Sequence, residues 1–378
     1  MFTVEFKNND NYGEIEFPCD ENYLFSKLNE LRAEDMLNPQ LTAVKIDVDE
    51  LKFVEGKQTN VDELNFLAKY LESLIDREVD TFLAIVQAEH ISTLKSAINA
   101  AFNQGNYTLI QNISNMEQIG KTHFMAVNQG MTEEEKTQTD FEKIGRDLMN
   151  SGKGIVTGKG VLFEHENAEQ QEFYNGKTFP LYLYENCMYV ADAEYEGKHE
   201  YLYLPAIPVA IHKALNRLGA KSPEECSITI YDESGKGTDW LETIVRIADE
   251  ESIDTANRIA ARINKMSAKT RFKLKAVMDF ADRKDGESII RLADNLGSFS
   301  FYPNVSDKEE LGRAMIEENE DYRIDLDLED YFQYAQFAED ALQQYDSEFM
   351  ESGVVILRGR TLSEVLEETQ EHSMDLSL

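Results

Sequence analysis

The chain has 378 residues, which is enough for two or three domains with hydrophobic cores of their own. Apolar residues make up 42% of it and aromatic residues 10%, and this content excludes a wholly disordered chain. Its 72 acidic and 37 basic residues give a formal charge of −35, which opposes binding to nucleic acid and to anionic membrane surfaces.

The N-terminal sequence MFTVEFKNND lacks the basic and apolar regions of a signal peptide, and no apolar run reaches membrane-spanning length. The three cysteines, Cys19, Cys187 and Cys226, lie far apart and form no CxxC pair. This pattern is typical of a reducing compartment. We therefore expect a cytoplasmic protein without a disulfide or zinc framework.

Residues 1–50 are predicted to form a small α/β module. FTVEF and GEIEF alternate as two strands around the NNDNYG turn, and LTAVKIDV at 41–48 is a further predicted strand. A helix over residues 21–33 would place Leu24, Leu28 and Leu31 on one face.

A block of three helices is predicted next. Asp62 is the expected N-cap of the first helix, whose leucines recur at helical spacing. The second helix is expected around Thr81–Ala88 and the third over Ser92–Asn103, with Gly105 as its C-cap.

This helical block is repeated 192 residues later. With Val61 aligned to Ile253, the register holds without a gap to Phe124 and Ile316. Identical pairs along it include Asp62/Asp254, Ala68/Ala260, Ala84/Ala276, Ser96/Ser288, Ile98/Ile290, Ala101/Ala293, Asn103/Asn295, Gly105/Gly297, Asn112/Asn304, Ser114/Ser306, Glu117/Glu309 and Gly120/Gly312. The flanking stretches correspond more weakly. The sequence thus predicts a tandem duplication.

The stretch between the two copies is rich in predicted strands: KGVLFEHE, KTFPLYLYE, NCMYVADAEY and HEYLYLPA. MTEEEKTQTD at 131–140 is the expected mobile linker, and GVVILRG is a closing strand. The predicted fold class is α+β, an elongated, tandem-duplicated arrangement of small α/β and helical modules with an acidic surface. The expected divisions are a small α/β module at 1–60, the first helical repeat at 61–130, an acidic linker and helix at 131–152, a β-rich central module at 153–252, the second helical repeat with an acidic aromatic helix at 253–350, and a strand and tail at 351–378.

The most acidic stretch, residues 306–350, is predicted to be folded rather than disordered. Eight apolar residues in it have the spacing of one helix face: Leu328, Tyr331, Phe332, Ala335, Ala338, Leu342, Tyr345 and Phe349. A helix with this apolar face would display the intervening carboxylates to solvent. We therefore expect a rigid array of exposed negative charge.

The sequence contains no strong catalytic or metal-binding motif. The six histidines lack metal-ligand spacing, and His165, which lies among carboxylates, is interpreted as a helix-surface or loop residue rather than a ligand. GKGIVTGKG at 152–160 lacks the order of a phosphate-binding loop and is interpreted as a turn, and IDLDLED at 324–330 lacks the glycine and closing glutamate of an EF-hand. Carboxylates could still be paired by the fold. We expect no enzyme activity, no cofactor and no metal.

One region is rich in basic residues although the chain as a whole is acidic. Ten basic residues lie between positions 258 and 291: Arg258, Arg262, Lys265, Lys269, Arg271, Lys273, Lys275, Arg283, Lys284 and Arg291. They could form a nucleic-acid patch, but the first four have the spacing of a solvated helix face. Ion pairing with the chain's own acidic residues, or with a second subunit, is the preferred interpretation.

The charge itself indicates mimicry of DNA rather than binding to it. A duplex carries two phosphates per base pair, so a charge of −35 equals that of roughly 17 base pairs. A folded protein with carboxylates along its helices could compete for a groove lined with Lys and Arg. It would also avoid the energy of bending a duplex into that groove.

Several blocks in order resemble the ArdA antirestriction proteins, in particular the long versions on conjugative elements of Gram-positive bacteria. The most specific are the D-EL--LA--L pattern in VDELNFLAKYLESL and the F-F-P-V-D-EELG pattern in LADNLGSFSFYPNVSDKEELGRAMIEE. The likeness also includes LEDYFQYAQFAED and the central FPLYLYENC segment. Where relatives carry a Y-GR pattern, the first copy has IGRD at 144–147 and the second has AQFA. This departure leaves two questions open: whether both copies present the same surface, and whether they make the same dimer contacts.

The resemblance implies an elongated, cytoplasmic, usually dimeric protein that mimics bent B-form DNA. Its partner would be the DNA-binding subunit of a type I restriction–modification enzyme, and it would protect incoming mobile DNA. The expected binding surface comprises Asp307, Glu309, Glu310, Glu317, Glu318, Glu320, Asp321, Asp325, Asp327, Glu329, Asp330, Glu339, Asp340, Asp346 and Glu348, with Glu133, Glu134, Glu135, Asp140 and Glu142 in the first copy.

Two alternatives remain open from the sequence. The protein could inhibit another DNA-binding defence complex, of CRISPR or BREX type. It could also be an acidic adaptor that binds basic protein partners through scattered charge.

Overall fold

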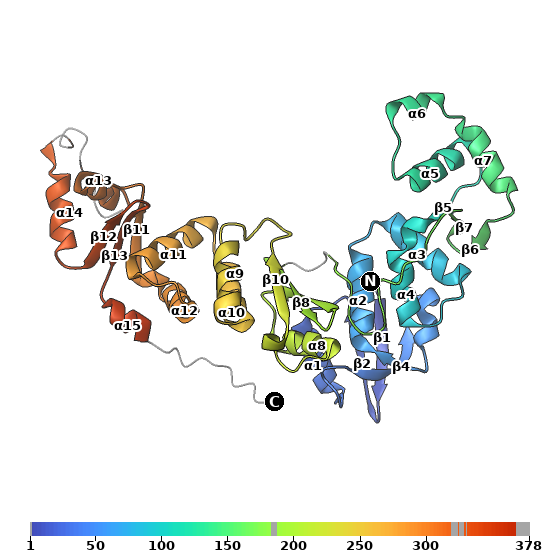
Figure 1. Cartoon of the computed structure of the whole chain (residues 1–378), viewed down its shortest axis with the longest axis horizontal. Coiled ribbons are helices and arrows are strands. Elements are labelled where there is room, and N and C mark those ends of the chain that lie inside the picture. Colours follow the sequence, from blue (N-terminus) through green and yellow to red (C-terminus); the bar gives the residue numbers. More distant parts are fainter. Residues whose placement is uncertain (1, 183–186, 319–323, 325–328, 330, 368–378) are drawn as a thin grey trace. The chain divides into compact units, whose positions relative to one another are not determined.

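The computed structural model describes residues 2–182, 187–318, 324, 329 and 331–367. The chain divides into two compact units (Figure 1). The first comprises Met1–Asn186 with Ala191–Ile228, and the second comprises Cys187–Val190 with Thr229–Leu378. Helices and strands are mixed throughout, which confirms the predicted α+β class.

The first unit opens with a four-stranded sheet in the order β2-β1-β3-β4. The predicted hairpin is confirmed, since Phe2 faces Phe17 and Val4 faces Ile15 in antiparallel register. Leu24 and Leu28 of the covering helix are fully buried, as their spacing predicts. The elements are β1 (Phe2–Asn8), β2 (Asn11–Phe17), α1 (Glu21–Glu30), β3 (Gln40–Ile46), η1 (Asp49–Val54) and β4 (Gln58–Asn60).

The helical block packs onto this sheet and shares its core. Leu64 and Leu67 of its first helix are fully buried beside the strand residues. The side chain of Asn60 caps that helix by accepting from the Asp62 and Glu63 N–H groups, so the prediction of Asp62 as N-cap is wrong. The third helix ends at Phe102 with Asn103 as its C-cap, so the prediction of Gly105 as the cap is wrong. The elements are α2 (Val61–Glu72), α3 (Asp76–Ala88), α4 (Leu94–Phe102) and η2 (Gln104–Asn106).

A three-stranded sheet in the order β5-β7-β6 follows, with helices packed beside it. Residues 152–160 form a bend and the hairpin strand β6, in line with the prediction of a turn. The expected linker at 131–140 instead contains a short helix, because Thr132 and Glu135 close a capping box at its start. The elements are β5 (Tyr107–Ile110), α5 (Met116–Asn128), α6 (Glu133–Gln138), α7 (Phe141–Asn150), β6 (Ile155–Thr157) and β7 (Gly160–Glu164).

The segment that links the two sequence copies has fewer strands than predicted. Residues 177–182, the described part of KTFPLYLYE, form no strand. Their aromatic residues pack against the first core instead, and the ring of Phe179 stacks on that of Phe66 at 4.5 Å. The next sheet has the order β10-β8-β9. Its elements are β8 (Tyr189–Tyr195), β9 (Lys198–Leu204), α8 (Pro208–Leu218), η3 (Pro223–Glu225) and β10 (Ser227–Tyr231).

The remainder of the second unit is a helical block followed by a three-stranded sheet in the order β11-β13-β12. Serines 252 and 267 cap two of the helices through their hydroxyl groups. The elements are α9 (Leu241–Glu250), α10 (Ile253–Ile263), α11 (Ala268–Ala281), α12 (Gly286–Asp294), η4 (Leu296–Ser298), β11 (Phe299–Pro303), α13 (Lys308–Glu318), α14 (Tyr334–Leu342), β12 (Asp346–Met350), β13 (Gly353–Leu357) and α15 (Leu362–Glu367).

The long acidic aromatic helix predicted to reach Phe349 is wrong in extent and face. Its helical part is α14, on which Tyr334 and Ala338 are buried while Ala335 is exposed. The residues after it form β12, in which Phe349 faces Val354 of β13. This segment forms a strand and not a helix because β13 follows after a two-residue turn and pairs with it in antiparallel register along its whole length. Leu328 lies outside the described residues.

Candidate functional site

The best-defined candidate site is the folded part of the acidic stretch. We call residues 299–357 the acidic module: the sheet β11-β13-β12 with helices α13 and α14. Its small core contains Tyr302, Leu311, Ala338 and Ile356. At Gly312 the two helices meet so closely that a Cβ atom would lie 2.1 Å from the Tyr334 carbonyl oxygen. Only glycine fits there, so this contact fixes α13 against α14.

Most of the candidate carboxylates in this module face solvent. Glu329 and Glu339 are half-buried, and Glu320, Asp321, Asp325, Asp327 and Asp330 lie outside the described residues. Exposed are Asp307, Glu309, Glu310, Glu317, Glu318, Asp340, Asp346 and Glu348. Eight of the candidate carboxylates in the described part of this module are therefore exposed on elements that share a packed core.

A few local contacts orient these carboxylates without neutralising the surface. Asp307 accepts hydrogen bonds of 2.9 Å from the Glu309 and Glu310 N–H groups at the start of α13. Arg313 lies 3.2 Å from Glu309 and 3.4 Å from Glu329. Exposed pairs of this kind contribute about 0–1 kcal/mol each, so their effect is to hold side-chain directions.

The five candidate residues of the first copy belong to the other compact unit. Glu133 pairs with Lys136, and this hydrogen bond lowers the pKa of the Glu133 carboxyl. Glu135 accepts from the Thr132 N–H, which lowers its pKa in the same way. Asp140 caps α7 by accepting a hydrogen bond from the Lys143 N–H. Glu142 forms an ion pair with Arg146, and Glu134 accepts a hydrogen bond from the Gln138 side chain.

Several basic residues of the second helical block form ion pairs within the chain. Arg258 lies 3.1 Å from Glu287, Arg262 lies 2.7 Å from Asp294, and Arg271 lies 3.0 Å from Asp239. The ammonium of Lys275 lies over the buried Trp240 ring. The interpretation of ion pairing with the chain's own carboxylates is confirmed for Arg258, Arg262 and Arg271.

Sequence reasoning missed a pair of histidines. The Thr108 hydroxyl lies 3.0 Å from His123 Nδ1 and 2.8 Å from His165 Nε2, and the rings meet edge to face. Burial lowers the pKa of both imidazoles, so the neutral forms are favoured. His165 lies on a loop after β7, as predicted, and contacts Thr108 of β5 and the ring of His123 on α5. No sequence signal pairs it with His123, 42 residues away.

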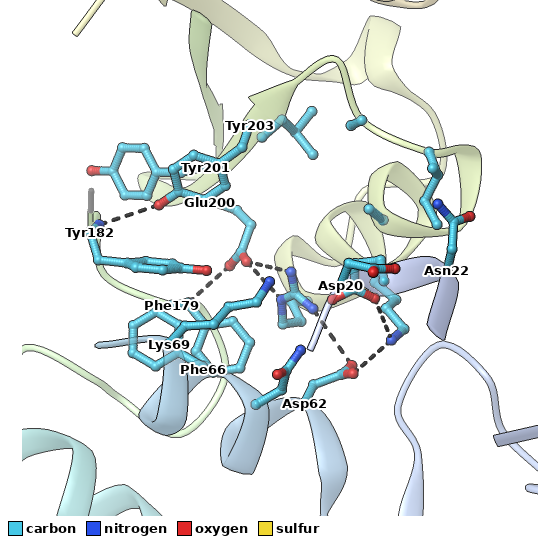
Figure 2. A pocket seen from close by; sticks show the side chains of 18 of the residues that line it. Asp20, Asn22, Asp62, Phe66, Lys69, Phe179, Tyr182, Glu200, Tyr201 and Tyr203 are labelled. Atoms are coloured by element: carbon cyan, nitrogen blue, oxygen red, sulfur yellow. Dashed lines mark hydrogen bonds and ion pairs between the residues drawn. The ribbon is translucent and has the colours of Figure 1, made fainter. Parts of the chain in front are cut away.

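A second candidate is a cavity of about 250 Å³ inside the first unit, shown in Figure 2. Its wall holds a network of buried charges. Lys213 donates to Asp62 at 2.6 Å and to Glu21 at 3.1 Å, and Arg217 lies 2.6 Å from Glu200. Figure 2 shows Glu200 and Asp62 joined through this network by dashed lines, with aromatic rings, among them Phe66 and Phe179, lining one side.

The network balances its own charges. Burial raises the pKa of the Asp62 and Glu200 carboxyls, against the pull of Lys213 and Arg217. Burial also raises the pKa of the nearby Cys19 thiol to about 12, which makes it a poor nucleophile. The arrangement is that of a structural ion cluster. The one sequence signal for it is Lys213 and Arg217, four residues apart on the largely apolar helix α8.

Two further properties concern the described residues only. Among them, no three His, Cys, Asp or Glu side chains converge in a way that could hold a metal ion. Within the same ranges, none of the helices combines the length and the apolar character needed to cross a membrane.

The described residues define an α+β protein, and the whole sequence carries a formal charge of −35. The family model described as antirestriction protein (ArdA) matches residues 189–356, which run from the start of β8 almost to the end of β13. This part of the chain is similar to the ArdA antirestriction family, and the resemblance seen in the sequence is confirmed over these residues. Neither a curated protein nor a solved structure matches the chain.

Proposed function

We propose that the protein inhibits type I restriction–modification enzymes by mimicking B-form DNA. It would occupy the DNA-binding groove of the target's DNA-binding subunit and so protect incoming mobile DNA. It would act by binding and not by catalysis, without a cofactor, and would not bind nucleic acid itself. We further propose that it acts as a homodimer, as the family resemblance implies.

The charge of the acidic module carries this proposal. Residues 299–357 contain sixteen Asp and Glu against three Lys and Arg, a net charge of −13. The same charge on a duplex occupies about six to seven base pairs. The described carboxylates among them lie on α13, α14, β12 and the adjoining turns beside a packed core, so this part of the charge is presented without the entropy cost of ordering a flexible tail.

Proteins that grip DNA do so through rows of Lys and Arg, and the resulting affinity falls as salt rises. A mimic of the phosphate backbone should inherit that salt dependence. It should also be blind to the recognition sequence of its target, since the base edges have no counterpart on a carboxylate surface.

The test is a DNA-cleavage assay with a purified type I enzyme, in which the protein is added at rising concentration and at two salt concentrations. Inhibition that weakens with salt, and that is equal for enzymes of different recognition sequence, is the expected result. A folded protein that leaves cleavage unchanged would contradict the proposal and favour another DNA-binding defence enzyme or an adaptor role.

A further inference from the structure

The structure repeats almost its whole element order once. The strands and helix β1, β2, α1 and β3 correspond to β8, β9, α8 and β10 with a shift of 187 residues in their starting positions. The helices α2, α3 and α4 correspond to α10, α11 and α12 with a shift of 192, and β5 and α5 correspond to β11 and α13 with the same shift. The strand β7 then corresponds to β13 with a shift of 193.

The equivalence extends to strand order and register. The sheets β5-β7-β6 and β11-β13-β12 have the same order. In the first, Tyr107 faces Glu164, and in the second the equivalent Phe299 faces Leu357. The central strand of each sheet, β7 or β13, begins with a glycine that has a positive φ. The angle is +142° at Gly160 and +134° at Gly353.

The helix contact beside these sheets is repeated as well. A Cβ atom on Gly120 of α5 would lie 1.9 Å from the Phe141 carbonyl oxygen of α7. The equivalent Gly312 of α13 meets the Tyr334 carbonyl oxygen of α14 at 2.1 Å. A shared backbone approach of this kind is specific, because any side chain would push the helices apart.

The family match covers one copy only. Residues 189–356 correspond through these shifts to residues 2–163. We propose that residues 2–164 are a second ArdA-type unit that has lost the acidic charge of its last module, so that the chain presents one acidic binding face and not two. The second half of this statement rests on the proposed function.

The loss of charge is large. The first-copy counterpart of the acidic module, residues 107–164, has eight Asp and Glu against six Lys and Arg, a net charge of −2 instead of −13. On the shared helix, the two copies keep one acidic position, Glu117 and Glu309. At the positions of Glu310, Glu317 and Glu318, the first copy has Gln118, Met125 and Ala126.

The two modules share a fold but differ in net charge, so we expect only the acidic module to bind a cationic groove strongly. A groove lined with cations gains little from a surface of net charge −2, since its attraction for the partner scales with the phosphate-like charges presented. The last module of the first copy thus adds little to the binding of a cationic groove.

Two charge-matched variants of the full chain test this inference. One carries Glu317→Gln, Asp340→Asn, Asp346→Asn and Glu348→Gln in the acidic module. The other carries Glu117→Gln, Glu134→Gln, Asp147→Asn and Glu164→Gln in the first copy. All eight residues are exposed, and each variant removes four negative charges from a total of −35. Circular dichroism and the fluorescence of Trp240 check that both remain folded.

In the type I cleavage assay, we expect the first variant to need about tenfold more protein for half-inhibition and the second less than about twofold more. An equal loss in both variants would overturn the single-face inference while leaving DNA mimicry intact, because total charge alone would then set the inhibition. A larger loss from the first-copy variant would overturn it too. A wild-type protein that does not inhibit would instead refute the proposed function on which the inference rests.

Hydrogen exchange of the protein bound to the enzyme provides an independent readout. Protection confined to α13, α14 and β12 is the expected result. Comparable protection of α5 and α7 would contradict the single-face inference.

Discussion

Replacing Lys213 by Met should destabilise the first unit strongly. The ammonium is 3% exposed and lies 2.6 Å from Asp62, which is itself 8% exposed. The replacement keeps the volume of the side chain and removes the charge, so it leaves a buried carboxylate without its closest cation. Arg217 cannot substitute fully, because its nearest nitrogen lies 3.9 Å from Asp62. Breaking a buried pair in this way costs about 3–5 kcal/mol.

The matched control is Lys308→Met, which removes a cation from an exposed pair with Glu339 at 3.2 Å, with both side chains more than two-fifths exposed. That change should cost no more than about 1 kcal/mol. The double variant Lys213→Met with Asp62→Leu should recover part of the loss, since removing both charges leaves less of the cluster unpaired.

The assay is native-state hydrogen exchange on the peptides of α2 and α8, with α12 of the second unit as an internal reference. The opening free energy at α2 and α8 should fall in Lys213→Met by the amount given above and stay near the wild-type value in Lys308→Met. Equal exchange in wild type and Lys213→Met would show that the cluster is not a structural ion cluster, and the cavity beside it would then be better interpreted as a ligand site.

Three further outcomes are expected. Single changes such as Glu309→Ala or Glu318→Ala should alter inhibition by less than about twofold, because each removes one of many screened contacts, and a large loss from either would count against distributed mimicry. Gly312→Ala should lower the melting temperature and the inhibition, because its Cβ would clash with the carbonyl of the neighbouring helix, whereas Gly297→Ala, which meets open space, should change neither. Stability of the first unit should be fully present above pH 6.5 and be lost as the pH falls through the lowered pKa of the paired histidines, because the unfolded chain then binds more protons. A His123→Gln variant in urea titrations between pH 7 and 5 should flatten this slope, and an unchanged slope would exclude the histidine pair as its source.

Local patterns in the sequence determined much of this protein. Alternation predicted the β1–β2 hairpin, and helical spacing predicted the buried face of α1 and α2. These features follow from nearby residues, because side-chain period and turn chemistry act over a few positions. The charge of −35 and the family resemblance are likewise properties of the sequence itself.

The tertiary structure decided which partner each ambiguous residue takes. Asp62 has the residue type and the position expected of a helix cap, yet the side chain of Asn60 caps the helix. The Asp62 carboxylate instead binds Lys213, which is 151 residues away. The local pattern of the acidic residues after α14 is compatible with a helix, but they form the strand β12 because they pair with β13. Both outcomes depend on contacts that no local period encodes, because burial and strand pairing are settled by which distant segment lies alongside.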